Sequence, residues 1–401
     1  MKKKILIYDD RDDLRGKVRA MLESVPTVSD AFTIMTPVQE EMRQSMNTLA
    51  ERRDEFRETG TWEVEEADLD TASIFVVDFE LFEAVPFLDG ETVAYLARCF
   101  SSCGLIVGYR YADNSFDLTL RGALQGELQS FTDVYVGGEQ LSNASLWTLV
   151  EDEKTGFRPW HWPVLPSYLR DLEKKVHDVK ESLPDSAPIC QVLGLAPDLF
   201  KMLPRTTSQF LGRNPSETSF REFATESGSG LELGDAEAVG DNSHDLLARV
   251  GATRISKWLE RLVLPGQDTL VDAPHLVSRY PSLLLGDAED IRVWNRTGRL
   301  TDHEDLGLSS KLIEPFRFKQ SHWLSRPAWL WDALRESESI DEVKQPWQFK
   351  KPDWVFCEDT SRFHEEDKCH QFVADLSSPF SRRFAKVVEG VDYRPRVRFS
   401  I

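Results

Sequence analysis

The N-terminal third of this chain alternates short apolar runs, typical of buried strands, with runs that have the apolar spacing of amphipathic helices. The strand-like runs lie at 4–8, 31–35, 73–77, 104–108 and 133–136, and the helix-like runs at 14–22, 37–57, 91–100 and 118–128. Such alternation is typical of a parallel sheet covered by helices on both faces. It predicts a doubly wound α/β domain of five parallel strands at 1–150, with an inserted or extended helix at 37–60.

The sequence after residue 150 predicts a separate organisation. Proline and tryptophan cluster at 158–163, which interrupts regular structure and indicates a domain boundary. We expect a helical connector at 151–211, a flexible loop or linker at 212–244, where Gly, Ser, Asp and Glu dominate, and a C-terminal α+β domain at 245–401. The expected fold class is a flavodoxin-like doubly wound sheet at the N-terminus, followed by an α+β region whose family is not recognised.

Charge and hydropathy restrict the partners of this protein. The 68 acidic and 48 basic side chains give a formal net charge of −20, whose field repels phosphate backbones and anionic lipid. Nucleic acid is therefore a disfavoured partner. The first apolar run stops at Asp9, and no window has the length of a signal peptide or a membrane span. The five scattered cysteines are expected to be reduced thiols, so we predict a cytoplasmic protein without membrane contact.

Aspartates follow two of the predicted strands at the points where the strands end. Asp9 and Asp10 come after the first strand, and Asp78 ends the strand at 73–77. The carboxyl ends of parallel strands share one edge of a doubly wound sheet, where ligands bind. Three carboxylates at that edge suit a hard divalent cation such as Mg²⁺. A cation there would also shield an aspartate from an incoming phosphoryl group.

At these residues the chain resembles the receiver domain of bacterial two-component response regulators. The stretch 5–10 (ILIYDD) is similar to the opening of a receiver, 74–78 (IFVVD) to its phosphoacceptor strand, and 87–91 (FLDGE) to the turn before its third helix. The resemblance covers residues 1–145. It implies that Asp9 and Asp10 bind Mg²⁺ together with Asp78, and that Asp78 is the phosphoacceptor.

The sequence departs from the receiver pattern at the residues that read out phosphorylation. Receivers carry a Ser or Thr after strand four and a Lys after strand five, whereas this chain has Gly108 and Gly137-Gly138 there. Three interpretations stay open: a degenerate receiver that serves as a fixed interaction module, a receiver still phosphorylated at Asp78, and a flavodoxin-like domain with ordinary strand-end acids. Without the hydroxyl and the Lys, coupling of phosphate to conformation is expected to be weakened or rerouted.

The C-terminal region contains residues that match chemical motifs at the level of spacing. Asp353, Glu366 and Lys368 satisfy the pattern of PD-(D/E)xK nucleases, in which two carboxylates hold a metal and the Lys assists the attacking water. Arg382 and Arg383 could clamp an anion bidentately. Cys and His ligands for zinc gather at 357–370 without the spacing of paired ligands, so zinc is not expected.

The sequence therefore favours a signalling or adaptor protein over an enzyme. Its receiver-like domain would engage a kinase or effector by protein contact, with optional phosphorylation of Asp78. Receiver-like domains joined to unfamiliar modules also resemble components of bacterial phosphorelay or defence systems. The alternative is a metal-dependent hydrolase or nuclease in the C-terminal domain, using Asp353, Glu366 and Lys368 and regulated by the receiver-like domain.

Overall fold

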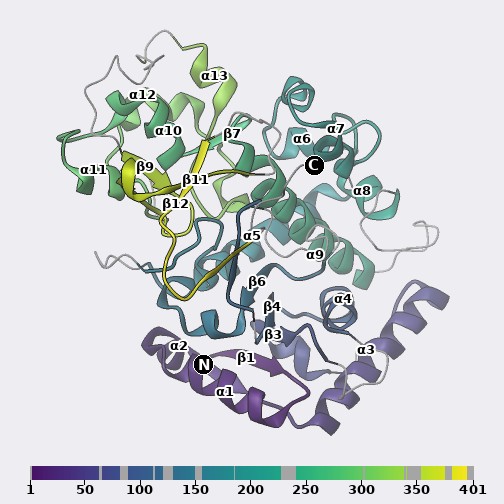
Figure 1. Ribbon diagram of the computed structural model, residues 1–401. Coiled ribbons are helices and arrows are strands. Elements are labelled where there is room, and N and C mark those ends of the chain that lie inside the picture. The colour runs from purple at the N-terminus through teal and green to yellow at the C-terminus, as the bar shows by residue number, and fades with distance from the viewer. Residues whose placement is uncertain are drawn as a thin grey trace, which may run out of the picture.

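The computed structural model shows an α/β domain joined to a larger mixed region (Figure 1). It describes residues 2–62, 66–81, 89–111, 113–120, 130–149, 156–184, 186–226, 241–300, 303–337, 340, 354–374 and 382–394. In Figure 1 the α/β domain lies at the bottom in purple and blue, and the later elements lie above it in teal, green and yellow.

A five-stranded parallel sheet forms the centre of the N-terminal domain. Its strands are β1 (Lys3–Tyr8), β2 (Phe32–Met35), β3 (Ile74–Asp78), β4 (Leu105–Arg110) and β6 (Val134–Gly137). They pair in the order β2-β1-β3-β4-β6, and every pairing is parallel. This order is the flavodoxin-like arrangement, so the predicted fold class is confirmed. All five strands lie within two residues of the runs predicted from the sequence.

Helices cover both faces of the sheet because successive strand residues point to opposite sides. One core joins Ile5, Ile7, Ile74 and Val76 to α1 (Asp12–Glu23), α2 (Pro26–Ala31) and α5 (Leu165–Ser182). The other core joins Leu6, Tyr8, Phe75 and Val77 to α3 (Gln39–Thr59) and α4 (Gly90–Phe100). The sheet is therefore doubly wound, as predicted.

The predicted long helix at 37–60 is α3. Its buried side includes Met42, Met46, Leu49 and Phe56, at the spacing of one helix face, and it ends at Gly60 with a φ of 75°. Arg52 pairs with Asp70 at 2.8 Å and donates to the Phe100 carbonyl oxygen at 2.8 Å, which fixes the helix against the domain.

The elements after residue 150 share a core with this domain. α5 packs against α9 (Asp241–Trp258), and the buried cluster that contains α3 and α4 continues through α9 to Leu324 and Ala328. Lys257 at the end of α9 donates to the carbonyl oxygens of Ser130 and Thr132 at 3.1 and 2.6 Å. The helical region and the N-terminal α/β domain therefore pack against each other at this junction.

The remaining elements form small helices and three small sheets. The helices are α6 (Ile189–Val192), α7 (Arg205–Ser208), α8 (Phe220–Glu226), α10 (Ala273–Arg279), α11 (Ile291–Arg296), α12 (Ser310–Ile313) and α13 (Trp331–Arg335). The strands are β5 (Ser115–Asp117), β7 (Leu270–Asp272), β8 (Ala328–Leu330), β9 (Trp354–Cys357), β10 (Arg362–Glu365), β11 (His370–Val373), β12 (Arg382–Ala385) and β13 (Asp392–Arg394). The small sheets have the orders β10-β9-β12-β11, β7-β8 and β13-β5. A mixed α/β region thus follows the doubly wound sheet.

Some elements differ from the sequence predictions at their boundaries. The helix α9 starts at Asp241, inside the range predicted as a loop or linker, and continues beyond Trp258 as the π-helical turn η7 (Leu259–Val263). The range 212–244 contains α8 and the start of α9, and its residues 227–240 lie outside the described part of the chain. The helix predicted at 118–128 also falls largely outside the described part of the chain. None of the helices described is both long and apolar enough to cross a bilayer.

Candidate metal centre

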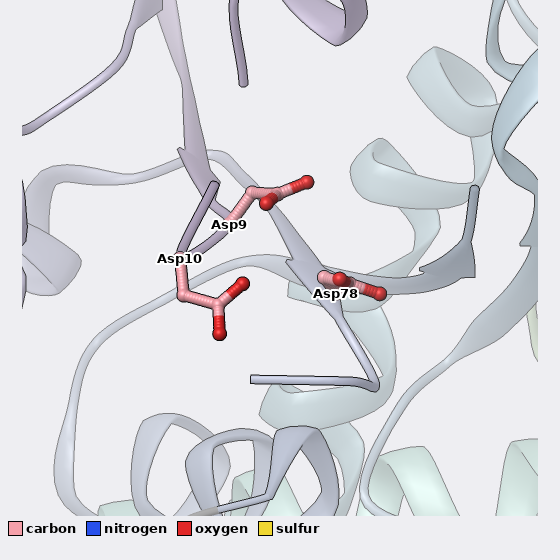
Figure 2. A group of neighbouring side chains, drawn as sticks. All are labelled: Asp9, Asp10 and Asp78. Carbon is pink, nitrogen blue, oxygen red and sulfur yellow. The ribbon is translucent and has the colours of Figure 1, made fainter. Parts of the chain in front are cut away.

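Asp9, Asp10 and Asp78 converge at the carboxyl edge of the N-terminal sheet. Figure 2 shows Asp9 and Asp10 on the turn after β1 and Asp78 at the end of the neighbouring strand β3. One carboxylate oxygen of each residue lies within 4.8 Å of one of each of the other two. The site occupies the point between β1 and β3 where a flavodoxin-like sheet reverses its strand order, which is where such folds bind ligands.

Asp9 is fully buried and held in one orientation. The Tyr109 hydroxyl donates to Asp9 Oδ2, and the Arg11 backbone N–H donates to Asp9 Oδ1 at 2.9 Å. Arg15 donates to the Asp9 backbone oxygen at 2.8 Å, which anchors α1 below the site. Burial raises the pKa of Asp9, while the two hydrogen bonds to its carboxylate oppose that shift. The side chain is therefore preorganised with lone pairs left for a further ligand.

Asp78 is 5% exposed and has fewer compensating contacts. The backbone N–H of Glu80 donates to its Oδ1 at 3.2 Å. Burial raises the pKa of Asp78 to about 7, and the negative charges of Asp9, Glu80 and Asp10 add to that shift. A cation at the site would remove this repulsion.

The three carboxylates fit a hard divalent cation. Oxygens on opposite sides of a bound Mg²⁺ lie about 4.2 Å apart, so small side-chain movements would bring the three ligands to one ion. Arg15 is paired with Asp12 and the Asp9 backbone oxygen, and its charge opposes the rise in the pKa of Asp9 only in part. Among the residues the structure describes, this is the one cluster of three or more His, Cys, Asp or Glu side chains with atoms close enough to share a metal.

Gly90 allows α4 to begin directly against the end of β3. A Cβ at this position would lie 2.4 Å from the backbone oxygen of Asp78 and 2.5 Å from Phe79 Cα. Asp89 caps the helix by accepting from the backbone N–H of Thr92 at 2.8 Å. The Asp-Gly pair noted in the sequence therefore positions α4 beside the site.

An aromatic ring occupies the place where a receiver carries its hydroxyl. A Cβ on Gly108 would lie 2.0 Å from Cε2 of Phe79, the residue that follows Asp78. The ring of Phe79 also meets Tyr135 of β6 edge to face, with centroids 5.2 Å apart. Gly108 is thus needed for packing, and this position is closed by a hydrocarbon ring.

The place of the receiver lysine is closed by backbone. A Cβ on Gly137 would lie 1.8 Å from the carbonyl oxygen of Asp113, and one on Gly138 would lie 2.6 Å from Tyr111 Cα. The segment after β4 therefore packs onto the end of β6 at these positions, and a longer side chain would collide with main-chain atoms.

The C-terminal candidate residues are engaged in local contacts. Lys368 pairs with Glu365, and Glu366 lies 3.9 Å from Arg382, while Asp353 falls outside the described residues. Lys368 and Arg382 are exposed. The described geometry therefore gives Glu366 and Lys368 surface partners, and the convergence of all three nuclease candidates stays a prediction.

Arg383 is buried, in contrast to its neighbour Arg382. It pairs with Glu358 at 2.6 Å and also contacts His275 and the Pro265 carbonyl oxygen. His275 in turn bonds to Asp272 at 2.5 Å, so the four side chains form one charged network between β7, α10 and the β9–β12 sheet. Arg383 is occupied by this network, and the pair does not act as two adjacent exposed arginines.

Two of the cysteines and one histidine at 357–370 make separate contacts. Cys357 and Cys369 approach each other with sulfurs 3.4 Å apart, whereas His364 bonds to the Thr360 hydroxyl at 3.0 Å.

Sequence reasoning missed Tyr109 and Phe79 as site residues. Tyr109 follows Gly108 on β4, and its strand position was available as a signal because alternate residues of β4 face alternate sides. Phe79 offered no such signal, because its contact with Gly108 depends on the path of the chain after β3.

No protein-family model matches this sequence, and no curated protein matches it at a significant level. The fold and the site define a doubly wound α/β domain that carries an acidic pocket at its strand-order reversal.

Proposed function

We propose that the N-terminal domain is a receiver-like module that binds a divalent cation, Mg²⁺ in the first instance, through Asp9, Asp10 and Asp78. The observation that carries this proposal is the convergence of three carboxylates at the reversal point of the sheet. Two of them are buried, and buried carboxylates at such short range need a compensating positive charge.

We further propose that the module acts in signalling or as an adaptor, by contact with a protein partner such as a kinase or effector. The support is indirect: Phe79 fills the space beside Gly108, and backbone fills the space beside Gly137 and Gly138. A phosphoryl group on Asp78 would meet neither a hydroxyl nor a lysine at these positions. The docking surface would therefore keep one shape, and binding of the partner would not require phosphorylation. A phosphorelay or a bacterial defence system is the setting that such a domain fits by analogy.

Two measurements on the full-length chain test the proposal separately. Titration with Mg²⁺ by calorimetry should show one saturable site in the wild type and strongly weakened binding in Asp9→Asn. Asp13→Asn is a matched control, because Asp13 is an exposed acid on the next helix. Absence of a saturable site in the wild type would end the proposal.

Phosphorylation is tested by incubation with Mg²⁺ and acetyl phosphate, followed by intact-mass measurement. A phosphoryl adduct in the wild type that is absent in Asp78→Asn would identify a receiver that still accepts phosphate. Cation binding without an adduct would identify a fixed interaction module.

A further inference from the structure

A cavity of about 180 Å³ lies beside the metal centre without including its carboxylates. It opens at the carboxyl ends of β4 and β6, and its walls come from the N-terminal domain, the 159–162 segment and β13. An engineered apolar cavity of about 150 Å³ admits benzene, so this space has the size for a small planar ring system.

Aromatic side chains form much of the wall. Phe79 and Tyr135 meet edge to face at 5.2 Å, and Phe116 faces His161 with centroids 5.9 Å apart and planes 33° apart. The rings of His161 and Trp162 meet edge to face, with centroids 6.4 Å apart. Flat aromatic walls favour a flat ligand that can stack on them.

Three of these rings carry polar atoms that have no hydrogen-bond partner among the residues described. They are the Tyr135 hydroxyl, the His161 ring nitrogens and the Trp162 indole N–H. None of these atoms is among the fully enclosed polar atoms that lack a partner, and all three residues line the cavity. Burial, with Arg261 and Arg326 nearby, lowers the pKa of His161 well below its usual range, so the neutral ring offers one donor and one acceptor.

The charges around the cavity favour a neutral ligand. Arg110 is paired with Glu80 at 3.0 Å and Arg394 with Asp392 at 2.7 Å, which leaves neither as a dedicated anion clamp. The lining also includes three acids, Glu91, Asp113 and Asp117, which repel phosphate and carboxylate groups. A ligand that matches these walls is planar, uncharged and equipped with its own donors and acceptors.

We infer that this cavity binds a nucleobase, presented as a neutral nucleoside, between its aromatic walls with Tyr135, His161 and Trp162 at the base edge. The inference is independent of the cation proposal, because Asp9, Asp10 and Asp78 do not line the cavity.

The test is saturation-transfer NMR on the full-length protein with adenosine, guanosine, cytidine and uridine at millimolar concentration, followed by affinity titration of any nucleoside that binds. Tyr135→Phe and Trp162→Phe each remove one hydrogen-bonding atom and keep an aromatic ring. Each should weaken binding about 3–10-fold, the worth of one net hydrogen bond. Tyr111 follows β4 and does not line the cavity, so Tyr111→Phe should bind as the wild type does.

Two results would overturn the inference. One is the absence of saturation transfer to all four nucleosides. The other is binding that is unchanged in both cavity variants, which would place the ligand elsewhere. Asp78→Asn should keep nucleoside affinity while it loses cation affinity, so failure of one proposal is distinguishable from failure of the other.

Discussion

The contact between Gly108 and Phe79 predicts a strong coupling between two substitutions. An alanine at position 108 would place its Cβ 2.0 Å from Phe79 Cε2. Carbon atoms pack at about 3.5–4.0 Å, so the ring would have to retreat by at least about 1.5 Å. That movement would also disrupt its edge-to-face contact with Tyr135. Overpacking of this kind costs about 1–3 kcal/mol, so Gly108→Ala should lower the stability of the N-terminal domain by that amount.

The same substitution should be harmless once the ring is gone. In a Phe79→Ala background the added methyl group has space, and replacing a strand glycine gains up to about 1 kcal/mol from the unfolded state. The double-mutant cycle should therefore give a coupling energy of about 1–3 kcal/mol or slightly more, with the double variant at least as stable as Phe79→Ala alone.

Thermal unfolding followed by near-ultraviolet circular dichroism, with guanidinium titration as a second probe, measures this cycle. A loss of 1 kcal/mol corresponds to about 2–4 °C for a unit of 150–250 residues. Equal costs of Gly108→Ala in the two backgrounds would refute the packing argument, as would an unchanged midpoint in the single variant.

Three further predictions concern buried or partly buried groups. Arg98 and Asp133 form a buried ion pair at 2.5 Å. Arg98→Met should lower the free energy of unfolding by about 3–5 kcal/mol, because it leaves the Asp133 carboxylate buried without its partner. A denaturation midpoint close to that of the wild type would contradict this. Burial lowers the pKa of Lys175 from 10.5 to about 8. Below pH 8 the buried ammonium group is charged and destabilises the folded state. The free energy of unfolding should therefore rise between pH 8 and 10.5, where the folded protein loses this proton and the unfolded chain keeps it. Lys175→Met should therefore be more stable at pH 7 by about 3 kcal/mol. An advantage that does not shrink towards pH 10 would exclude this cause. Cys357 and Cys369 should form a disulfide on treatment with hydrogen peroxide, which is reduced to water as the two thiols lose their hydrogens. Peptide mapping that finds no cross-link between them would contradict this prediction, as would the same oxidation product in Cys369→Ser.

The sheet was predictable because its determinants are local. Runs such as Ile74–Val77 are β-branched or aromatic over their whole length, and a buried parallel strand requires just that composition. The acidic triad was predictable for a related reason, since the position of an aspartate at a strand end fixes the edge on which it lies. In both cases the chain neighbours of a residue decide its environment.

Contacts between distant segments were not predictable in the same way. The pairing of β5 with β13 joins strands of three residues each, too short to produce a periodic signal. Arg383 was grouped with Arg382 because they are adjacent, yet strand alternation turns one to solvent and the other into the network with Glu358. Phe79 belongs to the same class, because its role is defined by a glycine about thirty positions further along the chain.

The β5–β13 pair has a consequence for the order in which the protein is completed. β13 comes after all other described strands and helices in the chain, yet it pairs in parallel with β5 and receives a bond from the Leu118 N–H at the Arg394 carbonyl. The strands of the parallel sheet are all synthesised before residue 140, whereas the β5–β13 pair can form only after residue 394 has been synthesised. A nascent or C-terminally trimmed chain would therefore present an unpaired β5 strand and a cavity that lacks Arg394, and its ligand binding would report whether synthesis had run to β13.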